Sequence, residues 1–138
     1  MIDFSYQTTF ILATELDVSK WIGDTLVAEG FVEGDISYVF CDDEFLLSIN
    51  KEFLSHDTFT DIISFDYSLD KEVHGEIYIS VERVRENAES FKSAFIDELH
   101  RVIIHGILHY CGYKDKTEAA STEMRRKEDE ALSRRNFV

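Results

Sequence analysis

Two apolar, strand-forming segments, residues 61–67 (DIISFDY) and 75–80 (GEIYIS), follow each other with only a short acidic turn between them. Parallel strands need a crossover connection of about a dozen or more residues, whereas antiparallel strands can be joined by a tight turn. The two segments therefore predict an antiparallel pair of strands. A sheet that contains this pair cannot be built from parallel strands alone.

Strand and helix patterns alternate in the rest of the chain. Apolar alternation and helical periodicity predict strands at 4–11 and 35–41 and helices at 15–29, 42–54, 81–90, 93–111 and 119–134. Asp42 or Asp43 can cap the helix at 42–54, in which we expect Phe45 and Phe53 to face inward. This order predicts an α+β fold in a single domain over residues 1–138, with a small mixed sheet of four strands and about five helices.

The chain is acidic, with a net charge of −14. Acidity argues against nucleic acid as a partner, because contacts to phosphates need Lys and Arg. However, residues 114–138 hold seven of the fourteen basic residues and carry a charge of about +1, so a polyanion would have to approach this part. No apolar run reaches the roughly 20 residues of a membrane span. With no secretory signal and two cysteines expected to be reduced, the sequence predicts a cytoplasmic protein without a membrane partner, and it does not specify the oligomeric state.

The segment from His105 to Asp115 has the spacing of a metal site. Residues four apart on a helix share a face, so His105 and His109 can converge on one ion. Two histidines at this spacing can also be ordinary polar residues of a helix, but these two lie in an apolar stretch, where buried imidazoles need partners. Gly112 can end the helix in a left-handed turn and bring Asp115 back as a third ligand. We therefore predict one divalent transition metal ion, zinc first, with an open coordination position.

The same spacing of two histidines, a glycine and a third ligand occurs in metzincin proteases. Those enzymes carry a glutamate directly after the first histidine as the general base, and this chain has Gly106 there. Because glycine cannot accept a proton, peptide hydrolysis by that route is not expected. We expect the missing side chain to leave space beside the open metal position.

Three segments of the chain together resemble the YbeY family. The resemblance lies in residues 56–65, in residues 75–80, and in the residues His105, Gly106, Leu108, His109, Gly112 and Tyr113. It implies a zincin-like α+β fold and a metal-dependent endoribonuclease that acts on single-stranded RNA. It also implies a role in ribosomal RNA maturation and ribosome quality control, with ribosomal RNA or components of the small ribosomal subunit as partners.

The chain departs from the family pattern at two positions. The third ligand of the family is a histidine, whereas this chain has Asp115, a harder oxygen ligand that shifts the metal preference a little away from zinc. The family also has an arginine, thought to serve RNA binding or catalysis, where this chain has Leu54. Another cation would have to contact the phosphate, and the candidates are Lys51, Arg101 and Lys114.

His105 and Asp61 are the candidate catalytic residues for hydrolysis of the phosphodiester bond. No general base is evident from the sequence, and Asp61, which lies in the second segment of the resemblance, is one candidate. Asp61 can equally be a cap or turn residue beside Thr60. Glu98 is another candidate base, although we expect it to be an exposed helix residue, and we expect His100 to lie at the surface. The run at 125–127 (RRK) is interpreted as a solvated helix face, with an RNA contact as the alternative.

Two other functions stay open from the sequence alone. In a non-catalytic ribosome-assembly factor, the metal would only stabilise the fold. A metalloprotease-like hydrolase is the third possibility, and Gly106 argues against it. RNA cleavage that chelation abolishes and metal restores would separate the nuclease from the assembly factor.

Overall fold

Four strands form one sheet in the computed structural model, which describes residues 1–56 and 58–138. Asp57, part of the second segment that resembles the family, lies outside the described residues. The order across the sheet is β1-β2-β4-β3, with the bounds β1 Ile2–Tyr6, β2 Val32–Cys41, β3 Ile62–Asp66 and β4 Glu72–Ser80. β2 runs parallel to β1 and β4, while β3 runs antiparallel to β4. The predicted antiparallel pair and the mixed sheet are therefore confirmed.

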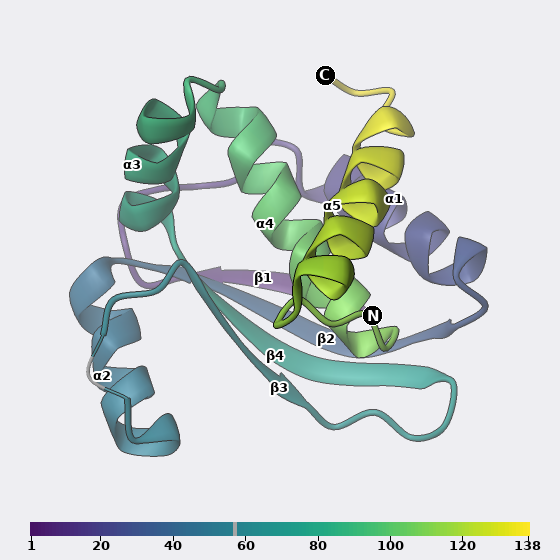
Figure 1. Cartoon of the computed structure of the whole chain (residues 1–138), viewed down its shortest axis with the longest axis horizontal. Coiled ribbons are helices and arrows are strands. Elements are labelled where there is room, and N and C mark those ends of the chain that lie inside the picture. The colour runs from purple at the N-terminus through teal and green to yellow at the C-terminus, as the bar shows by residue number, and fades with distance from the viewer. Residues whose placement is uncertain (57) are drawn as a thin grey trace.

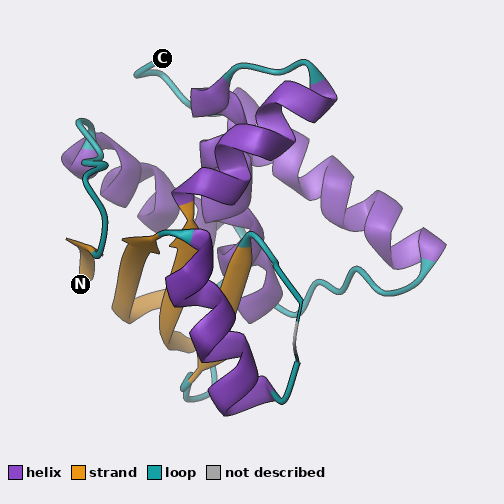
Figure 2. Ribbon diagram, turned by 90° about the vertical axis from the view of Figure 1, so that its left-hand side faces the viewer, coloured by secondary structure: helices purple, strands orange, loops and turns teal. Residues whose placement is uncertain are grey.

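Five helices surround this sheet in the described part of the chain. Their bounds are α1 Glu15–Ala28, α2 Asp43–Leu54, α3 Val81–Phe91, α4 Phe95–Tyr110 and α5 Glu118–Ser133. Figure 1 shows α1, α3, α4 and α5 over one face of the sheet and α2 on the other, and Figure 2 shows most of the helices above the strands from the side. This arrangement confirms the predicted α+β fold. None of the described helices is both long enough and apolar enough to cross a membrane.

The main core lies between the sheet and the four helices that share one face. Tyr38 and Ile77 of the central strands are fully buried there against Ile103 of α4. The hydroxyl of Tyr38 donates to the carbonyl of Ile103 over 2.8 Å, which fixes α4 directly on the sheet. A second, smaller cluster packs Leu46 and Ile49 of α2 against Ile63 on the opposite face.

One prediction about local structure is wrong, and another is confirmed only in part. The first strand covers Ile2–Tyr6 rather than 4–11, because Tyr6 already pairs with Phe40 near the end of β2, and beyond that point there is little strand left to pair with. Phe45 and Phe53 face the sheet, with their rings against those of Tyr78 and Phe65, but they remain 37% and 61% exposed.

Candidate metal centre

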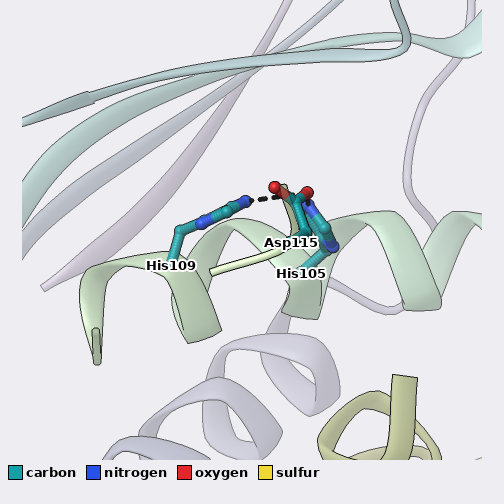
Figure 3. A group of neighbouring side chains, drawn as sticks. All are labelled: His105, His109 and Asp115. Carbon is teal, nitrogen blue, oxygen red and sulfur yellow. Dashed lines mark ion pairs between the residues drawn. The ribbon is translucent and has the colours of Figure 1, made fainter. Parts of the chain in front are cut away.

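His105 and His109 lie one turn apart on α4 and project from the same side of the helix (Figure 3). Their ring centroids are 4.6 Å apart and the rings are nearly perpendicular. The two side chains are 21% and 33% exposed, so they stand at the edge of the core and remain accessible from solvent. The predicted sharing of one helix face is confirmed.

A tight turn after α4 brings Asp115 back to these histidines. Gly112 has a φ of +97°, a left-handed conformation that favours glycine, and the amide of Tyr113 donates to the carbonyl of Leu108 over 3.1 Å. Asp115 Oδ2 then lies 3.2 Å from Nε2 of His105 and 3.3 Å from Nε2 of His109. One donor atom from each of the three residues lies within 4.8 Å of the other two. The sequence thus correctly predicted which three side chains meet.

The opposite nitrogen of each imidazole is already engaged. His105 Nδ1 lies 2.6 Å from Oε2 of Glu128, and His109 Nδ1 lies 3.0 Å from the carbonyl oxygen of Tyr113. Since both partners can accept hydrogen bonds, each Nδ1 carries the proton, which leaves the lone pair of a neutral imidazole on Nε2. Two such nitrogens and a carboxylate oxygen facing one another repel unless positive charge lies between them. Their number and chemistry fit a divalent metal ion.

Glu128 of α5 completes the surroundings of His105. It is only 5% exposed, and it accepts a hydrogen bond from Arg101 over 2.8 Å as well as the one from His105. Arg101 also binds Asp129 over 2.6 Å. Sequence reasoning missed Glu128. One pattern could have found it, since Glu128 shares a buried helix face with Met124 and Ala131 and is the charged member of that face.

Burial and negative charge act against each other on His105. Burial lowers its pKa, but the hydrogen bond to Glu128 and the negative charges of Glu128, Asp115 and Asp61 outweigh burial and raise the pKa above 6.5. These surroundings therefore favour positive charge at this place. A metal cation satisfies the same preference.

A pocket of about 250 Å³ opens beside His105 and Asp115, and Asp61 and Glu98 line it. The pKa of Asp61 is raised, mainly by burial, although His105 opposes the shift. The prediction that Glu98 is exposed is wrong, since it is 7% exposed and lies on the pocket wall. Glu98 lies about two helical turns before His105, and the lining of the pocket shows that α5 covers this face of α4 there. Burial raises its pKa too.

Other predicted residues lie elsewhere. Leu54 and the exposed His56 line a separate pocket at the end of α2. The prediction that His100 is a surface residue is wrong, because it is 1% exposed between the rings of Trp21 and Phe137. Helical spacing puts His100 on a different face from His105, as predicted, but that face is covered by α1 and the C-terminal segment.

Gly106 does not open space beside the metal donors, as the sequence suggested. A Cβ atom there would lie 3.0 Å from Ile77 Cδ1 and 3.2 Å from Ile62 Cδ1. The glycine therefore allows α4 to approach the sheet closely. This correction still leaves no general base at position 106.

The chain is similar to proteins of one family over almost its whole length. The sequence profile of the YbeY family, described as Endoribonuclease YbeY, matches residues 5–136. A relative named Endoribonuclease YbeY from Flavobacterium psychrophilum is 56% identical, over 96% of this chain and 94% of the relative. A second, with the same name, from Bacteroides thetaiotaomicron is 42% identical, over 95% of this chain and 98% of the relative.

A solved structure shows the same similarity in three dimensions. The solution structure of TM1509 from Thermotoga maritima aligns with a TM-score of 0.66 and 28% sequence identity, covering 96% of this chain and 87% of that one. Profile, relatives and fold agree with the three segments that resembled the family in the sequence. The chain belongs to the YbeY family.

Proposed function

We propose that this chain is an endoribonuclease that hydrolyses phosphodiester bonds in single-stranded RNA with a divalent metal ion held by His105, His109 and Asp115. The observation that carries the proposal is the convergence of these three donors, with both Nδ1 atoms already bound, at the mouth of a pocket. The names of the relatives supply the class of reaction.

The residues around the donors divide the work of hydrolysis. A bound divalent ion supplies positive charge beside the scissile phosphate and lowers the pKa of the attacking water. Glu128 and the carbonyl of Tyr113 orient the two imidazoles so that Nε2 faces the ion. We propose that Asp61 accepts the proton of the attacking water, since it lines the same pocket and its raised pKa brings it closer to neutral pH.

Zinc is the ion that we propose first. Two imidazole nitrogens and one carboxylate oxygen, with one position left open, form a donor set found in catalytic zinc sites. Asp115 makes this set harder than three histidines would be, so manganese or another transition metal competes more strongly with zinc here.

Ribosomal RNA is the substrate that we propose, with components of the small ribosomal subunit as further partners and the cytoplasm as the location. The charge distribution supports an approach of the RNA towards the C-terminal part of the chain. Acidic residues dominate before residue 114, whereas residues 114–138 are about neutral. That C-terminal part includes Asp115 and α5, which border the pocket.

The test is to measure metal content and RNA cleavage of the purified protein and of His109→Ala. We expect near-stoichiometric metal and chelator-sensitive cleavage in the native protein, and loss of both in the variant. His74→Ala, at a histidine of β4 that contacts Glu72 and the amide of Asp35 rather than the donors, is the control and should retain both. Full metal content and cleavage in His109→Ala would refute the ligand assignment. Metal without cleavage in the native protein would favour the non-catalytic assembly factor.

A further inference from the structure

The pocket beside the metal donors is acidic and would repel the phosphates of an RNA substrate. Four carboxylates line it, those of Asp61, Glu98, Asp115 and Glu128. A metal ion can attract the scissile phosphate, but the neighbouring phosphates of the strand still approach an acidic wall. A strand that enters here therefore needs a cation of the protein next to the pocket.

Two arginines, Arg101 and Arg125, line the same pocket, and they differ in what they bind. Arg101 is held by Glu128 over 2.8 Å and by Asp129 over 2.6 Å, and its side chain is only 17% exposed. Its guanidinium is thus committed to carboxylates of α5. Arg101, one of the candidate phosphate-binding cations, therefore lies in the right place but is already paired.

Arg125 lies at the pocket and its guanidinium can bind a phosphate. It is exposed on α5, and it forms no hydrogen bond or ion pair with any residue that the structure describes. Across the pocket, the positive charge of Arg125 opposes the burial that raises the pKa of Glu98. The neighbouring Arg126, by contrast, is bound to Glu123 over 2.6 Å.

Arg125 also borders a second, open groove on α5. Ser121, Thr122 and Asp129 line this groove with the two adjacent arginines. The hydroxyls of Ser121 and Thr122 can donate hydrogen bonds to phosphate oxygens. Because Arg125 belongs to the lining of both hollows, it marks the place where a strand would pass from one to the other.

We propose that Arg125 binds a phosphate that flanks the scissile bond and directs the RNA strand from the metal pocket along α5. The inference rests on the proposed function, because it takes single-stranded RNA as the substrate. It assigns the phosphate contact to a residue of the run at 125–127, which the sequence alone predicted as a solvated face. Arg125 would determine how the substrate is held, without a role in holding the metal.

The test compares Arg125→Gln with Arg134→Gln, which removes the same charge at the far end of α5, where Arg134 binds Glu130. Binding of a short fluorescent single-stranded RNA is followed by anisotropy in chelator between about 50 and 200 mM salt. One lost phosphate contact lowers the slope of log K against log salt by about 0.7, which corresponds to roughly fivefold weaker binding near 0.1 M salt. We expect this loss in Arg125→Gln only, while Arg125→Lys keeps the slope.

The metal-loaded proteins supply the second readout. Arg125→Gln should raise the KM for RNA cleavage and leave metal content and melting temperature unchanged. If Arg125→Gln and Arg134→Gln weaken binding equally and change the slope equally, Arg125 makes no specific contact and the inference is wrong. If the native protein neither binds RNA at low salt nor cleaves it when loaded with metal, the proposed function fails together with the inference, so the two failures are distinguishable.

Discussion

Replacement of Glu128 should weaken metal binding although Glu128 is not one of the proposed ligands. Its carboxylate accepts the Nδ1 proton of His105 over 2.6 Å and is 5% exposed, so water cannot readily replace it. Such partners of metal-binding histidines contribute roughly 10–100-fold in affinity, or about 1.4–2.7 kcal/mol. We expect Glu128→Ala, which removes the acceptor, to lie near the upper end. Glu128→Gln, which keeps an oxygen acceptor but loses the charge, should lie near the lower end.

Competition with a fluorescent zinc chelator measures this affinity directly. Asp129→Asn is the matched control, because Asp129 binds the same arginine, Arg101, over 2.6 Å but does not contact His105. Circular dichroism of the metal-free proteins shows whether each variant is folded. A folded Glu128→Ala variant that binds zinc as tightly as the native protein would refute the role of Glu128 in orienting His105.

Two further predictions concern stability. Burial, and to a smaller extent the charge of Arg135, lowers the pKa of His100 from 6.5 to about 4. The neutral imidazole therefore makes its full contribution to the free energy of unfolding above pH 6.5, and this contribution is lost as the pH falls towards 4. The difference between these pKa values corresponds to roughly 3 kcal/mol. Urea unfolding should show that the native protein loses about this much more stability than His100→Asn between neutral pH and pH 4. Equal losses in the two proteins would contradict the prediction. Gly106→Glu should destabilise the fold by about 3–5 kcal/mol and create no protease, because the new carboxylate would face Ile77 without a partner. Thermal unfolding and a casein assay check this, with Gly106→Ala as the milder control, and a stable or proteolytic Gly106→Glu variant would be the contrary result.

The order of elements could be predicted from the sequence because each element carries its own local pattern. The acidic turn between β3 and β4 also determined their antiparallel pairing. No local sequence pattern predicts that β2 lies between β1 and β4 and runs parallel to both, since this placement depends on contacts between residues far apart in the chain. For the same reason, periodicity separated the faces of α4 but did not show which of them were covered, and the exposure of Glu98 and His100 was predicted wrongly.

The candidate site divides in the same way. His105, His109 and Asp115 could be predicted because helix geometry and one glycine turn relate them. Helix periodicity could have identified Glu128 as the charged member of a buried face, but it could not place Glu128 beside His105, because the two meet only when α5 docks on α4. Gly106 was interpreted from chemistry alone, whereas its neighbours, Ile62 and Ile77, belong to strands that the motif does not contain.

The three metal donors lie within residues 105–115, whereas the group that orients His105 comes from position 128. Closing so short a loop costs little conformational entropy, so one helix and one turn are enough to bring the three donors together. Docking of α5 then places Glu128 against His105, which would raise the affinity of the donors for the ion. By linkage, an ion that binds more tightly after docking also stabilises the docked helix. A bound metal would therefore stabilise the docked C-terminal helix, and its removal should loosen α5 before it unfolds the sheet.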